Sequence, residues 1–136
     1  MIKSIVRDVM FLGLKSEKAT AADMSTALDL IDTLKANRAG CVGMAANMIG
    51  VRKRIIIVNA GLLDLVMFNP VITAKKDRYE TTEGCLSLAG QRNTVRYQTI
   101  TVSWQDMQMK KHSQTFTGWT AQIIQHECDH LDGIII

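Results

Sequence analysis

The residues with the clearest chemical potential lie near the C-terminus, in the run from Gln125 to His130. His126 and His130 are four positions apart, so on a helix both imidazoles project from one face and can bind the same metal ion. Glu127 follows the first histidine and stands beside that ion, where a carboxylate can accept and donate a proton. The H-E-x-x-H spacing is therefore typical of a metal-dependent hydrolase.

Two histidines leave a tetrahedral site incomplete. Catalytic sites of this kind add a third protein ligand and keep the fourth position for water. The third ligand is expected to be a carboxylate or a thiolate. Cys85 is the favoured candidate because it lies in a segment without helical or strand periodicity, as expected of a loop residue, and Cys41 and Cys128 are weaker candidates. Cys128 points away from His126 on the same helix and is expected to be structural.

A metal in this position would lower the pKa of its bound water toward ~7 and polarise a substrate carbonyl. Glu127 would accept the water proton and return it to the leaving group. Backbone N–H groups beside Cys85 are the natural donors to the oxyanion that forms on the substrate. These roles predict metal-assisted hydrolysis at a carbonyl group.

Two helices are expected to support this chemistry. Thr20 offers an N-cap for an amphipathic helix that can end near Gly40, in a left-handed turn. A second helix is expected from near Gly118 to about Leu131, with Gly133 as its stop, and it carries the histidines.

Short segments predict strands at residues 54–59, 65–68 and 113–116, and the alternation over residues 95–104 predicts a long strand with one solvated face. Pro70 breaks or bends what continues through residues 71–73, and the polar stretch 74–80 predicts a strand end and a turn. The expected fold is α+β. Short antiparallel β-sheets pack around the C-terminal metal-binding helix, with a second amphipathic helix near the N-terminus, in one domain covering residues 1–136.

Composition narrows the class of protein. Lys and Arg number 16 against 13 Asp and Glu, which predicts no DNA-binding surface, although the net charge of +3 is compatible with weak attraction to RNA-rich partners. Three irregularly spaced cysteines argue against a disulfide framework and for a reducing compartment. No apolar run approaches the ~20 residues of a membrane helix. A soluble cytoplasmic protein without membrane contact is expected.

Three segments resemble the signatures of the peptide deformylases. Glu83-Gly84-Cys85-Leu86-Ser87 and Gln125-His126-Glu127-x-Asp129-His130 are similar to two of them, and Cys41 to Met48 resembles the third, of the form G-φ-G-φ-A-A-x-Q. The segments occur in the family's order, and the similarity extends from about Thr20 onward. The cysteine and histidine segments together are highly specific for this family.

The resemblance implies removal of the formyl group from the N-terminal methionine of nascent bacterial peptides, on or near the ribosome. It implies Fe(II) as the native metal, with Zn or Ni able to replace it. The family pattern assigns Cys85, His126 and His130 as ligands, Glu127 as the acid and base, and the Leu86 N–H as an oxyanion donor.

By the same resemblance, Val42, Gly43 and Gly84 line the peptide-binding edge. Met44 and Met48 are candidates to face the substrate, whose own first side chain is methionine.

The chain departs from the family pattern at Cys41, where a glycine is expected, and at Met48, where a glutamine is expected. The glutamine amide donates to the oxyanion, whereas a thioether cannot donate. Loss of one such donor typically costs ~10²–10³ in turnover. A slow or narrowed enzyme is therefore expected. The alternatives are an altered amidohydrolase or a catalytically idle, metal-bound peptide-binding module; a conventional zinc protease is disfavoured by a cysteine ligand.

Overall fold

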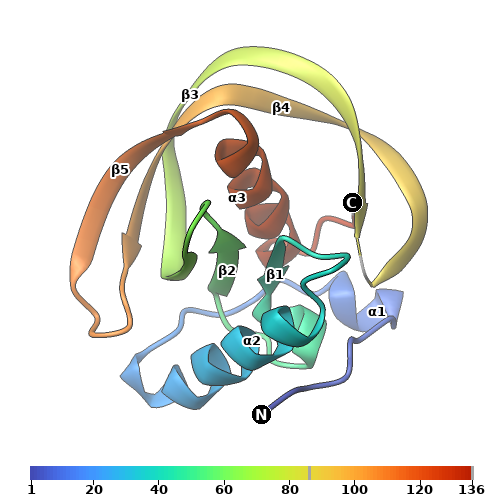
Figure 1. Cartoon of the computed structure of the whole chain (residues 1–136), viewed down its shortest axis with the longest axis vertical. Coiled ribbons are helices and arrows are strands. Elements are labelled where there is room, and N and C mark those ends of the chain that lie inside the picture. The colour runs from blue at the N-terminus through green and yellow to red at the C-terminus, as the bar shows by residue number, and fades with distance from the viewer. Residues whose placement is uncertain (86, 136) are drawn as a thin grey trace.

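The computed structural model describes residues 1–85 and 87–135, and Figure 1 shows its arrangement. The elements in chain order are α1 (Val9–Leu12), η1 (Ala21–Asp23), α2 (Met24–Ala36), β1 (Gly43–Ala45), η2 (Ala46–Ile49), β2 (Ile55–Asn59), β3 (Asp64–Cys85), β4 (Leu88–Gln105), β5 (Lys111–Thr117) and α3 (Gly118–Leu131). None of the helices in these two described ranges is long and apolar enough to cross a membrane.

The strands of the described residues form one antiparallel sheet in the order β1-β2-β3-β4-β5. Figure 1 shows β3 and β4 curving together over α3. β3 has 22 residues and β4 has 18, and both belong to this one sheet, so the expectation of several short sheets is wrong. The long strand expected at residues 95–104 lies within β4. The register shifts between Phe68 and Val71 and between Ile72 and Ala74, and such irregularities bend and twist a strand.

The expected turn over Ala74–Glu80 is also wrong, because this stretch is the middle of β3. Its residues pair with β4 from Ala74 opposite Thr101 to Glu80 opposite Val95. Most of these side chains are exposed, which explains their polar character. A solvated strand and a turn share this composition, and only the pairing with β4 distinguishes them.

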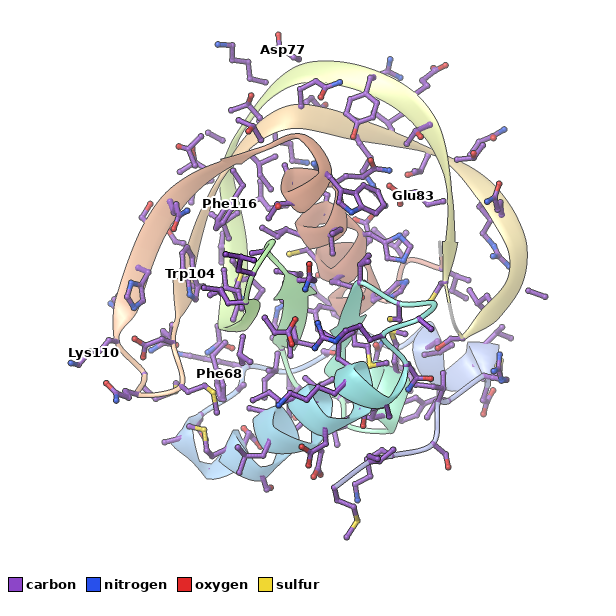
Figure 2. All side chains as sticks on the ribbon, viewed as in Figure 1. Phe68, Asp77, Glu83, Trp104, Lys110 and Phe116 are labelled. Atoms are coloured by element: carbon purple, nitrogen blue, oxygen red, sulfur yellow. The ribbon has the colours of Figure 1, made fainter. Side chains whose placement is uncertain are left out.

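The sheet separates two layers of buried side chains. Ile56 and Val58 of β2 pack in the cluster that contains Ile124 of α3, whereas Ile55 and Ile57 pack in the cluster that contains Leu30 of α2. Successive side chains of a strand point to opposite faces, so β2 is buried on both. Figure 2 shows Trp104 and Phe116 of the α3 cluster apart from Phe68, which lies near α2. Burial of each isoleucine side chain stabilises the folded state by roughly 1.5–3 kcal/mol.

The helix that carries the histidines coincides with the range expected from the sequence. α3 runs from Gly118 to Leu131, and Gly133 has a φ of 75° just beyond its end. The N-terminal helix is shorter than expected. Thr20 and Asp23 do form a capping box, but they cap the 3₁₀ turn η1, and α2 ends at Ala36 before Gly40 is reached.

Candidate functional site

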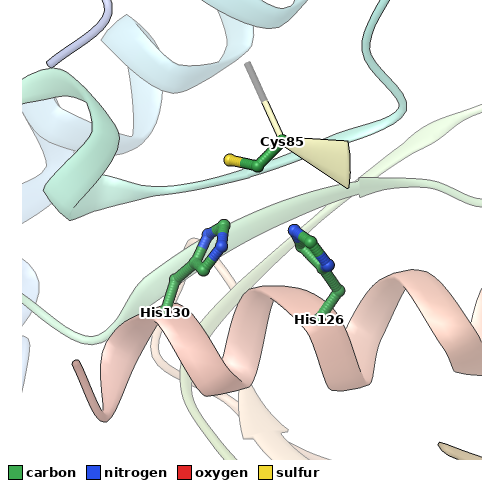
Figure 3. A group of neighbouring side chains, drawn as sticks. All are labelled: Cys85, His126 and His130. Atoms are coloured by element: carbon green, nitrogen blue, oxygen red, sulfur yellow. The ribbon is translucent and has the colours of Figure 1, made fainter. Parts of the chain in front are cut away.

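The three expected ligand residues converge in the folded chain. The Cys85 sulfur and one ring nitrogen from each of His126 and His130 all lie within 4.8 Å of one another. Figure 3 shows the thiol above the two rings, which rise from the same face of α3. Cys85 ends β3 at a register shift after Gly84, so the sheet itself delivers the thiol to the helix.

Electrostatics within this cluster favour a thiolate. Burial raises the pKa of the Cys85 thiol, but hydrogen bonds with His126 and His130 outweigh burial and lower the pKa to about 6. Burial lowers the pKa of both imidazoles, whereas their hydrogen bonds with Cys85 raise it, to about 9 in His126 and about 10 in His130. Each group therefore stabilises the charged form of its neighbour.

This donor set fits a divalent transition metal. Metal binding requires a deprotonated thiol, and the cluster supplies one at neutral pH. Sulfur and imidazole ligands suit Fe(II), Zn and Ni alike. Cys85 and His126 border an open cleft. A three-residue donor set at such a cleft is typical of a catalytic centre, because structural sites take four protein ligands and are closed.

Glu127 lies beside the cluster and is only 4% exposed. Its Oε1 is 3.2 Å from His130 Nδ1. On the other side, a Cβ placed on Gly43 would be 3.1 Å from Glu127 Oε2. The carboxylate is therefore held between α3 and β1 at the edge of the cleft.

A second, buried network orients His126. The ring Nδ1 lies 2.7 Å from Glu83 Oε1. Glu83 therefore engages Nδ1 and does not engage Nε2 on the other side of the ring. Arg96 donates two hydrogen bonds to Glu83 Oε1 and one to Oε2, and Gln122 donates one to Oε2 at 2.8 Å. Burial raises the pKa of the Glu83 carboxyl, but these hydrogen bonds outweigh burial and lower the pKa to about 2. A carboxylate behind a ligand histidine fixes the ring's tautomer and orientation.

Asp129 completes this network, since its Oδ2 accepts a hydrogen bond from Arg96 at 2.6 Å. The sequence alone does not decide whether Asp129 and Asp132 pair with other residues or are solvated charges at the end of the helix. Asp132 instead pairs with Arg54 at 2.9 Å. Sequence reasoning did not assign a role to Glu83, although its place two residues before Cys85 was a usable signal.

Replacement of Arg96 by leucine is expected to lower the free energy of unfolding by about 3–5 kcal/mol, because it strands the buried Glu83 charge. Both side chains are less than 10% exposed. Urea denaturation measures this loss. Arg78→Leu is the matched control, since its ion pair with Glu80 is exposed and should change stability by less than about 1 kcal/mol. Similar losses in both variants would contradict the importance of the buried pair.

A cleft of about 530 Å³ opens in front of the cluster, a volume suited to a small ligand or a short peptide. The cleft is lined by residues 40–43, residues 82–85, Gly90, Gln91, Met48 and one face of α3. The expected substrate-binding residues Val42, Gly43 and Gly84 are among them. Met44 is not, because alternation along β1 turns its side chain into the buried α2 cluster.

Met48 borders the cleft and is 1% exposed. Its sulfur lies 3.5 Å from the Ala45 backbone N–H, which donates to it. The side chain is thus folded back over its own turn. A thioether in this position can accept a hydrogen bond but cannot donate one. Leu86, whose N–H is the expected oxyanion donor, lies outside the residues that the structure describes.

The remaining candidates from the sequence lie outside the ligand cluster of the described residues. The Cys41 thiol lines the cleft and donates to the Gly43 carbonyl at 2.9 Å. Cys128 is buried in the α3 core. Gln125 bonds the Tyr97 backbone and so attaches α3 to β4.

Replacement of Gly43 by alanine is expected to destabilise the protein by about 1–3 kcal/mol and to lower activity, because the added methyl group overpacks the site. A Cβ at this position would lie 2.7 Å from Ile123 Cγ2 and 3.2 Å from the Ile57 carbonyl, besides its contact with Glu127. Thermal unfolding measures the loss of stability, and an assay of hydrolysis measures the loss of activity. The control is Gly40→Ala on the same cleft wall, where a Cβ meets nothing within 4 Å. Equal effects of the two substitutions would contradict the steric explanation.

Comparisons with known proteins agree with this geometry. A family model described as polypeptide deformylase matches residues 4–136. The chain is 59% identical to a peptide deformylase of Clostridium beijerinckii over 136 residues, which cover 100% of both chains. It is 39% identical over 112 residues to a peptide deformylase of Desulforudis audaxviator, covering 80% of this chain and 71% of that one.

Solved structures give the same result. The actinonin-bound class I type b peptide deformylase of Acinetobacter baumannii superposes with a TM-score of 0.88 at 29% identity, over 99% of this chain and 95% of that one. The Met-Ala-Ser-bound form of that protein has the same TM-score at 27% identity, over 99% and 97% of the two chains. With the family match over nearly its whole length, a full-length relative at 59% identity and the shared fold, this chain belongs to the polypeptide deformylase family.

Proposed function

We propose that this protein hydrolyses the N-formyl group from the terminal methionine of newly made peptides. The observation that carries the proposal is the Cys85, His126 and His130 cluster with Glu127 beside it, at an open cleft, in a member of the deformylase family. Because ribosomes produce the substrate, we propose that the reaction takes place on nascent chains in the cytoplasm.

A divalent metal held by Cys85, His126 and His130 would supply Lewis-acid chemistry, which polarises the formyl carbonyl and makes water acidic enough to act near neutral pH. Membership of the deformylase family favours Fe(II) as the native ion, and the thiolate and imidazole ligands suit Zn or Ni as well. Glu83 positions His126 for this task, and hydrogen bonds from Arg96 and Gln122 keep Glu83 ionised.

Glu127 carries the proton. Its carboxylate accepts a proton as water oxygen adds to the formyl carbon. Glu127 then donates this proton to the methionine nitrogen as the carbon–nitrogen bond breaks. Formate and a peptide with a free amino terminus are released. The burial of Glu127 between β1 and α3 holds it in place for both transfers.

The peptide is expected to lie along the cleft, between residues 40–43 and 82–85. Val42 and Gly43 on one side and Gly84 on the other offer backbone groups along which an extended peptide can bind. The A. baumannii deformylase, of the same fold, binds Met-Ala-Ser, the product such a reaction leaves. The Leu86 N–H remains our proposed donor to the oxyanion.

Steady-state hydrolysis of formyl-Met-Ala-Ser by anaerobically purified, Fe(II)-loaded protein tests the function, with formate release as the readout. Turnover with release of formate supports it. Cleavage of an internal peptide bond in an unformylated peptide would instead indicate a protease.

Replacement of Met48 by glutamine is expected to raise turnover by about 10-fold or more, because an amide donor returns to the oxyanion and one donor is typically worth ~10²–10³. Formate release by both proteins measures the gain. Met48→Leu is the matched control, since it keeps an apolar side chain of similar volume and adds no donor. Inactivity of both the wild type and Met48→Gln with metal bound would contradict this prediction and favour a catalytically idle peptide-binding module.

A further inference from the structure

Five residues of α3 line the cleft, and their spacing follows one face of the helix: Trp119, Gln122, Ile123, His126 and Glu127. They are separated by alternating steps of three and one, as residues on a single helical face are. The cleft therefore runs along α3. It extends from Trp119 in the first turn to the ligand histidine and the carboxylate in the third.

The length of this face can be compared with a peptide. Seven residues separate Trp119 from His126, which amounts to about 10 Å at a rise of 1.5 Å per residue. An extended peptide advances about 3.3–3.6 Å per residue. A peptide that follows the cleft, with its formyl carbon beside His126, therefore brings its third residue to Trp119.

Trp119 is unusually exposed for its size. Its exposed fraction is 61%, whereas Trp104 is 6% exposed and packs in the α3 cluster. The β4 side of the same cleft contains Gly90, where an added Cβ would meet nothing within 4 Å. The lining of the cleft thus includes a position with open space beside it and a large exposed apolar ring, whose face gains by being covered.

We propose that Trp119 is a specificity-determining residue whose indole packs against the third side chain of the peptide and selects an apolar group there. This inference rests on the proposed function, which identifies the ligand as a formylated peptide. The geometry of the cleft places the third residue of that peptide beside Trp119. Formyl-Met-Ala-Phe and formyl-Met-Ala-Leu then bind better than formyl-Met-Ala-Ser.

The test compares kcat and KM for these three peptides in the wild type, Trp119→Ala and Trp119→Phe. In the wild type, kcat/KM for the Phe peptide is expected to exceed that for the Ser peptide about fivefold or more, through a lower KM. Trp119→Ala brings this ratio close to one, and Trp119→Phe restores most of it. Leu62→Ala, an exposed apolar residue outside the cleft lining, keeps the wild-type ratio. A ratio near one in the wild type, or an unchanged ratio in Trp119→Ala, would overturn the inference.

A binding measurement separates this inference from the proposed function. In Trp104→Phe, Trp119 is the single tryptophan of the chain. Titration with the product peptide Met-Ala-Phe is expected to shift its fluorescence to shorter wavelength, with tighter binding than Met-Ala-Ser. If no formylated peptide is hydrolysed and this shift still occurs, the function fails and the role of Trp119 stands. If hydrolysis occurs and the Trp119 emission is unchanged at saturation, the role of Trp119 fails and the function stands.

Discussion

Replacement of Glu127 by glutamine is expected to lower kcat about 10²–10⁴-fold, the usual contribution of a general acid and base. The amide has the size and shape of the carboxylate but does not accept the water proton. Because the residue is 4% exposed and fits between His130 and Gly43, an isosteric change should leave the packing intact. Formate release under saturating formyl-Met-Ala-Ser measures the loss, and metal analysis measures retention of the ion.

The matched control for Glu127→Gln is Glu80→Gln, which makes the same chemical change at a solvent-exposed carboxylate on β3. It should keep the wild-type rate. If Glu127→Gln binds metal and its kcat is within about tenfold of the wild-type value, a group other than Glu127 must transfer the proton. Loss of metal together with loss of rate would show that Glu127 supports the ligand cluster and leave its proton role without support.

Replacement of Cys85 by alanine is expected to weaken metal binding by more than about a hundredfold and to abolish activity. Changes in groups that only orient a ligand already cost 10–100-fold in affinity, and this substitution removes a residue that we propose as a ligand itself. The two imidazoles that remain cannot complete a stable site. Metal content after dialysis, measured by elemental analysis, gives the result directly, and it does not depend on any activity assay.

Cys41→Ala is the control for this substitution, because Cys41 lines the same cleft and its thiol bonds the Gly43 carbonyl instead of joining the cluster. Burial raises the pKa of the Cys41 thiol to about 11, so it is protonated at neutral pH and a poor ligand. The control should retain its metal. The opposite result, with metal lost from Cys41→Ala and kept in Cys85→Ala, would reassign the third ligand.

The buried network behind His126 contains neither of the residues replaced in these two predictions. Glu83, Arg96 and Asp129 form a chain of charges that reaches one ligand ring without entering the cluster itself. Members of a buried network are energetically coupled, so truncating Arg96 affects Glu83 and His126 together. Met48 is the contrasting case. Its side chain borders the cleft and is well packed, but it offers no donor.

The sequence by itself determined the features that depend on local spacing. Helical periodicity placed His126 and His130 on one face, and the glycines around the last helix indicated where α3 begins and ends. The segment around Cys85 and its family resemblance supplied the third candidate ligand. The inferences about the helix succeed because a helix repeats every few residues, so its geometry is fixed by neighbours along the chain.

The tertiary structure decided everything that depends on partners distant in sequence. Residues 74–80 continue β3 because β4 pairs with them, and Met44 turns away from the cleft because β1 has a buried face on each side. Glu83 meets Arg96, Asp129 and His126 only when strand and helix pack together. Polar composition does not distinguish a turn from a solvated strand, and a carboxylate's role depends on which charges folding brings to it.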